Sequence, residues 1–582
     1  MQPPVNGDQP PGRTGEPVHS RRRSTALVVI ALLALLVPVA VIGAVVMAGS
    51  TIELQILEVS DWHGQVDAAG DVGGAPVLKA YFDAARAEHA NTLTLTAGDD
   101  VGATPPVSSY FKDVPAILAE RMMGIQAGTL GNHNFDSGLG RLQDQIDLAG
   151  STDPTVAGAP FRYVVANLAN RDANLSGLAD YTIFTYEGVD VAVIGVITES
   201  TASVTAPGSM GTMTTSDSVE AAKRAMAAAK ADGADVFIAL VHEGITSFRD
   251  GQPQGELVDF ANAVSGFAVI YGDHTDVAWS GTINGQLTVE NRSKGVTFTR
   301  TVLTIRRLGG EIVGRVSTQV SPVVADVTPD AGVAAMLTPY RDSLAPIFGT
   351  TIGTSGVAIP RADSCGTDVG RTCESLVGDV ITDAIRETRG TEIAVINSGG
   401  IRADLTCPTV DSASDFCPAF TAPPYLITRG QVNGVLPFGN ISVAATVDGA
   451  TLKAMLENGV SQMPAIDGRY PQVSGTCFTY DIEAPAGARV TGAVRTAADG
   501  SCTGEALDLT AASSYTLATN EYVAAGGDSY PAITGGVTYG FLDQDVADWL
   551  SAAGSVSPAL QGRIACTDAN PGSGDDCPAL VP

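Results

Sequence analysis

The stretch Gly131-Asn132-His133-Asn134-Phe135-Asp136 directly follows a strand-like run from Ile125 to Leu130. It combines three kinds of chemistry in six residues. Asn132 offers a neutral oxygen ligand, His133 a titratable imidazole, and Asp136 a carboxylate that could orient that imidazole. An Asn-His pair in a loop is, taken alone, usually part of a turn. This one is distinguished because other strand-like runs of the chain end in the same types of residue.

Four further runs with strand character are followed at once by Asp or His. They are Thr51 to Val59 before Asp61-Trp62-His63, Leu93 to Thr96 before Gly98-Asp99-Asp100, Val236 to Val241 before His242, and Phe267 to Tyr271 before Asp273-His274-Thr275-Asp276. In α/β proteins, ligands gather at the carboxyl ends of the strands. The five strand ends therefore predict one metal site assembled from distant parts of the chain.

The histidines favour this interpretation over ordinary turns, which are the usual role of Asp after a strand. Four of the six histidines of the chain lie at these strand ends beside an acid or an amide: His63, His133, His242 and His274. Asp and His are good ligands for zinc and manganese, and the first 364 residues contain no cysteine that could supply a thiolate.

Length and charge limit the classes of function. A chain of 582 residues should contain more than one domain, because single cores stop growing at roughly 250–300 residues. The net charge of −30 argues against a nucleic acid polymer as partner, since phosphate backbones are bound by clustered Lys and Arg. An anionic substrate must therefore be attracted by a local feature, either a metal or a few arginines.

The N-terminus resembles a targeting segment. Residues 1–24 are rich in Pro, Gly and Gln and include Arg21-Arg22-Arg23, so we expect a disordered basic tail. Ala26 to Ala48 has no charged residue, and we interpret residues 25–48 as a signal sequence or a transmembrane anchor. The basic cluster would remain on the cytoplasmic side. Whether this helix is cleaved stays open, but the rest of the chain is expected outside the cytoplasm.

All eight cysteines lie between Cys365 and Cys577, and none forms a Cys-x-x-Cys pair. An even number of cysteines outside the cytoplasm indicates disulfides rather than structural zinc. The close spacings favour pairing between neighbours, although other connectivities stay open. The favoured pairs are Cys365–Cys373, Cys407–Cys417, Cys477–Cys502 and Cys566–Cys577.

The pattern of the chain predicts two domains. β-rich runs alternate with helical stretches over residues 51–327, which indicates an α/β domain. One such helix is predicted from Asp217 to Ala231, with Asp217 and Glu220 at its start. The pattern then changes to a helical segment followed by a Gly- and Ser-containing stretch, so residues 328–356 are expected to be a linker helix and a hinge. A second domain should occupy residues 357–582.

These motifs together resemble a known family. Asp61-x-His63, Gly98-Asp99, Gly131-Asn132-His133 with Asp136, His242 and His274-x-Asp276 are similar to the motifs of calcineurin-like metallophosphoesterases. In the second unit, the matching stretches are Asn397-Ser398-Gly399-Gly400-Ile401-Arg402, Leu436-Pro437-Phe438-Gly439-Asn440 and Asn520 through Tyr530. They resemble the C-terminal domain of the 5′-nucleotidase and UDP-sugar hydrolase family. The resemblance covers about residues 51–545.

The resemblance implies an α/β fold: an N-terminal four-layer αββα metallophosphoesterase sandwich with a separate α+β C-terminal substrate-binding domain, preceded by one N-terminal hydrophobic helix. It also implies two divalent metal ions. Asp99 would bridge them, Asp61, His63 and Asp276 would complete one site, and Asn132, His242 and His274 the other. His133 would be catalytic without binding metal, with Asp136 holding its ring.

One departure from the family concerns the metal. Relatives usually have Gly-His-x-His or Gly-His-x-Gln where this chain has Asp273-His274-Thr275-Asp276. A carboxylate at Asp276 favours a harder ion such as manganese or magnesium over zinc. Zinc, manganese and magnesium therefore all stay open as the metal.

The second domain is expected to hold a nucleotide substrate. The resemblance implies that Arg371 and Arg402 contact its phosphate and that Asn397 lies near its base. Two aromatic rings, Phe438 and Tyr522, would sandwich the base, and Asp528 would hold the ribose hydroxyls. Tyr522 replaces the phenylalanine common in relatives, so its hydroxyl could alter the base preference.

The sequence thus predicts an exported dinuclear-metal phosphohydrolase that releases phosphate from 5′-nucleotides, with UDP-sugars as a further candidate substrate. A 2′,3′-cyclic-nucleotide 2′-phosphodiesterase with 3′-nucleotidase activity and a non-catalytic cell-surface binding protein are the alternatives. We expect the protein at the cell surface or secreted, with membrane contact only through an uncleaved N-terminal helix. The oligomeric state is left open.

Overall fold

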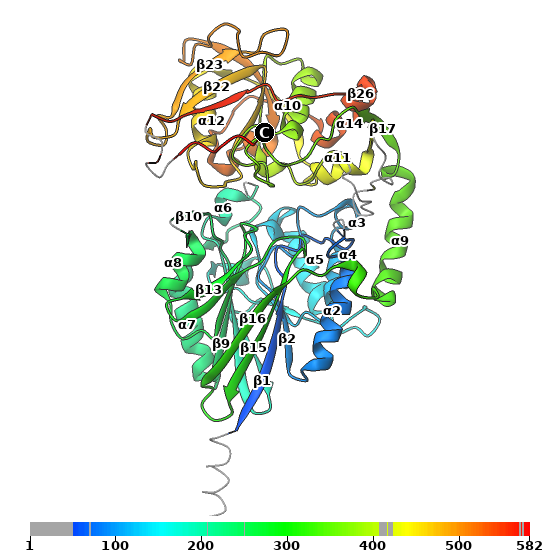
Figure 1. Cartoon of the computed structure of the whole chain (residues 1–582), viewed down its shortest axis with the longest axis vertical. Helices are drawn as coiled ribbons and strands as arrows, with labels where there is room; N and C mark the ends of the chain where they lie inside the picture. The colour runs from blue at the N-terminus through cyan, green and yellow to red at the C-terminus, as the bar shows by residue number, and fades with distance from the viewer. Residues whose placement is uncertain are drawn as a thin grey trace, which may run out of the picture.

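The computed structural model describes residues 50–68, 71–206, 208–249, 251–406, 416, 423–569, 572 and 576–581. The predicted N-terminal tail, the hydrophobic segment 25–48 and the predicted Cys407–Cys417 pair lie outside these residues. Within the described ranges, no helix is long and apolar enough to cross a membrane. The described chain forms two domains, one above the other in Figure 1, joined by a long helix at one side.

The first domain is built on two six-stranded sheets. The first sheet has the order β16 (Ile312–Val320), β15 (Phe298–Arg306), β1 (Thr51–Glu58), β2 (Thr92–Thr96), β3 (Ala127–Gly128) and β4 (Arg162–Tyr163). The second has the order β13 (Trp279–Ile283), β14 (Gln286–Glu290), β12 (Val269–Gly272), β9 (Val236–His242), β7 (Val189–Ile197) and β6 (Tyr181–Tyr186). Strands β1 to β4 are parallel to one another, as are β7, β9, β12 and β14.

The two sheets pack face to face through alternate residues of their central strands. Leu54 and Ile56 of β1 share one buried core with Val191 of β7 and Ile238 of β9. Side chains at intervening positions, such as Leu57, point to the other face and contact the outer helices. This period of two is the consequence of the pleat of a strand. Both sheets are therefore buried on both faces.

Helices cover the outer face of each sheet. The first sheet is covered by α2 (Ala75–Glu88), α4 (Val114–Met123) and α5 (Gly138–Gly150), and the second by α7 (Ser218–Ala231) and α8 (Glu256–Ala263). Helix α7 begins where the sequence predicted, because the Asp217 side chain accepts a hydrogen bond from the Glu220 amide at 2.8 Å. The predicted four-layer αββα sandwich is confirmed.

Short elements complete the loops of this domain. They are α3 (Pro106–Ser109), α6 (Thr201–Val204), η1 (Asn132–Phe135), η2 (Arg171–Ala173), η3 (Val324–Asp326), the pair β5 (Leu168–Ala169) and β8 (Thr214–Thr215), and the hairpin of β10 (Ser247–Arg249) and β11 (Gln252–Gln254). In Figure 1, α6 and β10 lie at the end of the sandwich that faces the second domain.

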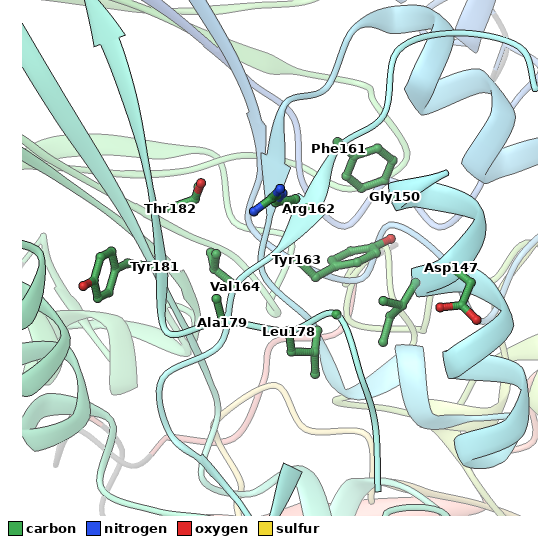
Figure 2. Close-up of a pocket in the computed structure, with 12 residues that line it drawn as sticks. Asp147, Gly150, Phe161, Arg162, Tyr163, Val164, Leu178, Ala179, Tyr181 and Thr182 are labelled. Carbon is green, nitrogen blue, oxygen red and sulfur yellow. The ribbon is translucent and has the colours of Figure 1, made fainter. Parts of the chain in front are cut away.

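A hollow of about 510 Å³ lies between the edge strands β4 and β6, where the sandwich is open. Figure 2 shows the rings of Phe161 and Tyr163 on one side and Tyr181 on the other, with Arg162 between them. The Tyr163 hydroxyl is buried and donates a hydrogen bond to the carboxylate of Asp100. The edge of the sandwich is thereby linked to the loop that follows β2.

The second domain contains three smaller sheets and five helices among the described residues. Its sheets have the orders β19 (Tyr425–Thr428), β17 (Thr351–Ser355), β26 (Ser555–Val556); β21 (Pro471–Ser474), β18 (Ile393–Asn397), β24 (Ser514–Asn520), β20 (Ile441–Asp448), β25 (Val537–Phe541); and β23 (Val490–Arg495), β22 (Thr476–Asp481), β27 (Ile564–Thr567). The helices are α10 (Leu376–Arg389), α11 (Arg429–Val435), α12 (Gly449–Gly459), α13 (Glu521–Ala524) and α14 (Leu542–Ala553), with short turns η4 (Ser398–Gly400) and η5 (Gly527–Ser529).

Helix α9 (Ala331–Phe348) connects the domains and is the long helix at the side of Figure 1. Its buried residues Val333, Leu337 and Leu344 belong to the core of the first domain. Strand β17 follows almost at once and pairs with β19 and β26 of the second domain. The connection between the two packed parts is therefore only residues 349–350, shorter than the expected linker.

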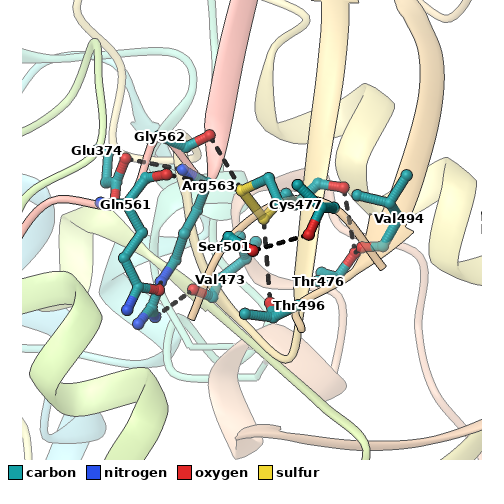
Figure 3. Close-up of a disulfide and its surroundings, with 12 residues drawn as sticks. Glu374, Val473, Thr476, Cys477, Val494, Thr496, Ser501, Gln561, Gly562 and Arg563 are labelled. Carbon is teal, nitrogen blue, oxygen red and sulfur yellow. Dashed lines mark hydrogen bonds between the residues drawn. A yellow bond between two sulfur atoms is a disulfide. The ribbon is translucent and has the colours of Figure 1, made fainter. Parts of the chain in front are cut away.

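Three disulfides lie in the described part of the second domain, with the predicted partners: Cys365–Cys373, Cys477–Cys502 and Cys566–Cys577. Figure 3 shows Cys477 on its strand beside Thr476, opposite the segment that contains Gly562 and Arg563. Sγ of Cys502 lies 3.4 Å from the Gly562 carbonyl oxygen. The bond thus fastens the β22–β23 hairpin close to the strand that ends the fold.

Removing this disulfide with the double variant Cys477→Ala/Cys502→Ala should lower the free energy of unfolding by about 2–4 kcal/mol, because an open chain has more unfolded conformations. Calorimetric melting of the full chain measures the change. The pair Cys365→Ala/Cys373→Ala is the matched control, since it closes a loop of 8 rather than 25 residues and should cost less. Equal melting temperatures for the first variant and the parent would contradict this expectation.

Candidate active site

The five predicted strand ends meet at one edge of the sandwich. Three come from the first sheet, after β1, β2 and β3, and two from the second, after β9 and β12. His242 lies at the centre: its Nε2 is 3.1 Å from Asp99 Oδ2, 3.2 Å from Asn132 Oδ1 and 3.3 Å from His274 Nδ1. His242, Asp99 and Asn132 are all buried. Residues far apart in the sequence therefore share one polar cluster.

The ligand-type atoms form three overlapping groups. One group contains His63, Asp99 and His133, a second Asp99, His242 and His274, and a third Asp61, Asp273 and Asp276. Within each group, the nitrogen or oxygen atoms lie within 4.8 Å of one another. Asp99 is shared by the first two groups. The predicted residues Asp61, His63, Asn132, His133, His242, His274 and Asp276 are thus brought together around it.

The loops that carry these residues have an unusual backbone. Asp61, His63, Asp99, His274 and Asp276 all have positive φ angles, which cost free energy in residues other than glycine. Backbone hydrogen bonds hold the loops in place: the amide of Asp61 donates to the Gly98 carbonyl at 3.1 Å and that of His63 to the Asp99 carbonyl at 2.9 Å. Such strain is typical of functional sites.

Gly98 is required beside the cluster. A Cβ atom at this position would lie 2.6 Å from Nδ1 of His242, and its φ of 109° disfavours any other residue. Only glycine lets the backbone after β2 approach this imidazole.

Two of the histidines are oriented as metal ligands are. Nδ1 of His242 lies 3.1 Å from the Ala97 carbonyl oxygen, and Nδ1 of His63 lies 2.9 Å from the Gly102 carbonyl oxygen. Because a carbonyl only accepts, Nδ1 carries a proton in both rings and Nε2 is the nitrogen that faces the cluster. A backbone carbonyl behind the imidazole is the usual arrangement around a metal-binding histidine.

Electrostatics also favour a cation here. Burial raises the pKa of Asp61 to about 7. Burial opposes the protonation of His242, but the carboxylates of Asp99 and Asp61 outweigh it and raise its pKa to about 9. Oδ1 of Asp61 is buried and accepts no hydrogen bond from any described residue. Carboxylates, imidazoles and an amide oxygen around such concentrated negative charge fit a divalent cation.

Asp273 is a buried residue whose role the sequence did not reveal. It accepts a hydrogen bond from the Ser60 hydroxyl at 2.5 Å and from the His274 amide at 3.0 Å. Burial, together with the nearby carboxylates of Asp61 and Glu290, raises its pKa well above the usual range. Asp273 therefore fixes the His274 loop to the end of β1. The only signal was an acid where relatives have glycine.

The second domain provides the opposite wall of a cleft of about 550 Å³. The predicted substrate residues all line it: Arg371, Asn397, Arg402, Phe438, Tyr522 and Asp528. Nη2 of Arg402 lies 3.2 Å from Nε2 of His63, and the Phe438 ring stacks on His133 at 5.6 Å between centroids. The two domains are therefore in direct contact across the candidate site.

A third arginine, Arg361, was not predicted. Its Nε and Nη2 atoms are buried and donate to no described residue, and the same is true of Nε of Arg371. Burial and the positive charges of Arg402 and Arg371 lower the pKa of Arg361 well below the usual range. Three guanidinium groups thus act on Asp276, and two of them, Arg361 and Arg371, have buried donors without a partner among the described residues. No glycine-rich motif lies beside Arg361 in the sequence, so no local pattern distinguished this arginine from arginines on the surface.

The far end of the cleft is held by a network of side chains around Asp528. Its Oδ2 accepts from the Asn397 amide at 2.7 Å and its Oδ1 from the Tyr522 hydroxyl at 2.7 Å. The Asn520 amide in turn donates to Asn397 at 3.3 Å. The Tyr522 hydroxyl is therefore occupied by Asp528, and it does not distinguish bases in this arrangement.

Comparison with known proteins agrees with this geometry. Residues 351–535 match the family model of the 5′-nucleotidase C-terminal domain. A structure of a 5′-nucleotidase precursor from Thermus thermophilus superimposes with a TM-score of 0.74 and 26% identity, covering 89% of this chain and 100% of that chain. The second domain thus matches a 5′-nucleotidase C-terminal domain, and the chain as a whole is similar to 5′-nucleotidases.

The curated relatives of this chain differ from one another in length. A snake venom 5′-nucleotidase from Gloydius brevicauda is 25% identical over 571 residues, 90% of each chain. Endonuclease YhcR from Bacillus subtilis is 27% identical over 507 residues, 83% of this chain. The chain spans only 38% of the length of that endonuclease.

The Asp99→Ala variant should lose most of its bound divalent metal, because Asp99 is shared by two of the ligand groups. Metal content per chain, measured by mass spectrometry after removal of free ions, tests this. Asp136→Ala is the matched control: it removes a carboxylate of the same cleft that belongs to none of the three groups. Unchanged metal in Asp99→Ala would reject the assignment.

Proposed function

We propose that this chain is an exported, metal-dependent phosphohydrolase that releases phosphate from 5′-nucleotides. The observation that supports it most strongly is the composition of the interdomain cleft. One wall carries the carboxylate and imidazole cluster, and the other carries arginines, two aromatic rings and the Asp528 network. These are the groups that a phosphate, a base and a ribose require, and they face one cavity.

The cluster has enough ligands for two ions. We assign Asp99 as the bridging ligand, Asp61, His63 and Asp276 to one ion, and Asn132, His242 and His274 to the other. Two such ions, when bound, polarise the phosphoryl oxygens and lower the pKa of a water. Zinc, manganese and magnesium all suit this donor set, and the extra carboxylate of Asp276 favours the last two.

His133 is the proposed catalytic residue. Its Nδ1 lies 2.9 Å from Oδ2 of Asp136, so the carboxylate orients the ring and leaves Nε2 for the cleft. A proton on Nε2 can donate to a phosphate oxygen and stabilise the charge that develops there. Phe438 stacks on the same ring and limits its rotation.

Three arginines can explain how a strongly acidic protein binds an anionic substrate. A protein with a charge of −30 repels an anion, so binding needs a local positive region. Arg361, Arg371 and Arg402 provide it beside the cluster, with buried donors on the first two that have no partner among the described residues. Planar guanidinium groups bind phosphate by paired hydrogen bonds.

The nucleoside would lie between the rings of Phe438 and Tyr522, since every base has a face on which an aromatic ring can stack. Asp528 would accept hydrogen bonds from the ribose hydroxyls. Each of its oxygens has one protein donor and keeps a further lone pair. Asn397 holds this carboxylate in place.

Release of product requires the cleft to open. We propose that the second domain rotates about residues 349–350, because α9 packs into the first domain while β17 already belongs to the second. The disulfides of the second domain are consistent with a protein that acts outside the reducing cytoplasm, secreted or at the cell surface.

A substrate panel tests the proposal. Purified protein with manganese, magnesium or zinc is given AMP, UDP-glucose and 2′,3′-cyclic AMP, and released phosphate or nucleoside is measured. We expect the highest kcat/KM with AMP and loss of turnover after chelation. Hydrolysis of 2′,3′-cyclic AMP without hydrolysis of AMP would favour the cyclic phosphodiesterase, and no hydrolysis with metal bound would favour a binding protein.

The His133→Ala variant should lose turnover of AMP by about 10²–10⁴-fold while its metal content stays that of the parent, because the ring stabilises charge without serving as a ligand. His89→Ala is the matched control, a histidine at the end of α2 and outside the cleft lining. Parent-like turnover in His133→Ala would remove this residue from the mechanism.

A further inference from the structure

One segment of the cleft has no role in the proposed reaction. It is the loop of residues 460–470 between α12 and β21, which we name the base loop. Its residues Ile466, Asp467, Gly468 and Arg469 line the same cleft as Tyr522 and Asp528. The loop therefore borders the space assigned to the nucleoside.

The base loop is fixed to the substrate-binding residues through its backbone. The Gly399 amide donates to the Gly468 carbonyl at 2.8 Å, and the Tyr530 hydroxyl donates to the Arg469 carbonyl at 2.7 Å. Gly468 also lies close to Asp528: a Cβ built on it would be 3.7 Å from Oδ2 of that residue. Arg469 is thus held next to the ribose position.

The side chain of Arg469 is oriented by its neighbour. Oδ1 of Asp467 accepts from both the amide and the Nε of Arg469, each at 2.9 Å. The side chain is 18% exposed, and in the described part of the chain no group accepts from its Nη1 or Nη2. A guanidinium held by Nε presents its two terminal nitrogens as a fork of donors.

The groups that the proposed function assigns to the nucleoside do not read the edge of a base. Phe438 and Tyr522 stack on any base, and the Tyr522 hydroxyl, Asp528 and Asn397 bond to one another. We infer that Arg469 selects the base, and that the preferred substrates are 6-oxopurine 5′-nucleotides. This inference rests on the proposed function.

The chemistry of the base edges leads to this choice. Guanine and hypoxanthine present two adjacent acceptors, O6 and N7, which match the fork of an arginine. Adenine presents N7 beside the N6 amino group, a donor that opposes the donors of Arg469. Pyrimidines lack the N7 acceptor. The preference should therefore follow the oxygen at position 6 rather than the amino group of guanine.

The experiment compares kcat/KM for GMP, IMP and AMP with the metal-loaded full chain. The parent should favour GMP and IMP equally over AMP. In Arg469→Met this ratio should fall by roughly five- to hundredfold, the discrimination that a paired arginine–guanine contact contributes. Arg469→Lys keeps the positive charge but lacks the two parallel donors of a guanidinium group, so most of the preference for GMP and IMP over AMP should be lost in this variant too. Arg224→Met, an exposed arginine on α7, is the matched control.

The outcomes separate the two proposals. Hydrolysis of all three nucleotides with equal kcat/KM, or a ratio unchanged in Arg469→Met, overturns the role of Arg469 and leaves the proposed function intact. A preference for GMP over both IMP and AMP also overturns it, because the amino group would then be read. No hydrolysis of any nucleotide overturns both. Both Arg469 variants should melt like the parent. A change in the kcat/KM ratios then reflects the cleft and not a loss of folding.

Discussion

Mutual repulsion among buried carboxylates is the constraint on which the rest of this structure depends. Asp61, Asp99 and Asp276 contribute to ligand groups at one edge of the sandwich, and Asp273 lies among them fully buried. Burying charge costs free energy unless it is paired and hydrogen-bonded. Backbone amides meet part of this requirement, since those of His133 and His274 donate to Asp99 and Asp61 at 2.8 and 2.9 Å. A divalent cation would meet the remainder.

The two-sheet sandwich stabilises this concentration of buried carboxylates. Its core is apolar and both sheets are covered, so the loops at the strand ends are fixed by a rigid scaffold. Positive φ angles and the close approach at Gly98 are stable only on such a support. The second domain then adds positive charge from the opposite wall, where Arg402 reaches His63. Each wall of the cleft carries the charge that the other wall lacks.

Much of this arrangement follows from local patterns. Strand-like runs that end in Asp, Asn or His predict the convergence of Asp61, Asp99, Asn132, His242 and His274 without any knowledge of the fold. Spacing also predicts the three described disulfides. The pattern could not show that the strand ends come from two sheets, because pairing between distant strands depends on tertiary packing rather than on any one segment.

Other features of the structure could not be predicted from the sequence for similar reasons. Arg361 and Asp273 have no neighbouring motif, and their importance arises from burial beside groups far away in sequence. The sequence suggested that the hydroxyl of Tyr522 could alter the base preference, but in the structure this hydroxyl donates to Asp528 at 2.7 Å. The sequence places β17 in the linker because glycine and serine are common in loops, whereas pairing with β19 and β26 decides the outcome. These hydrogen bonds and strand pairings depend on residues that are distant in sequence, so the local sequence does not determine them.

The distribution of cysteine has a consequence for how the protein responds to its surroundings. All eight lie after residue 364, so the domain that carries the carboxylate and imidazole cluster has no thiol to compete for a soft ion or to be oxidised. A reducing environment would therefore act on the second domain alone, where the described disulfides lie. Sensitivity to thiol chemistry and the carboxylate and imidazole cluster are thereby kept in separate domains.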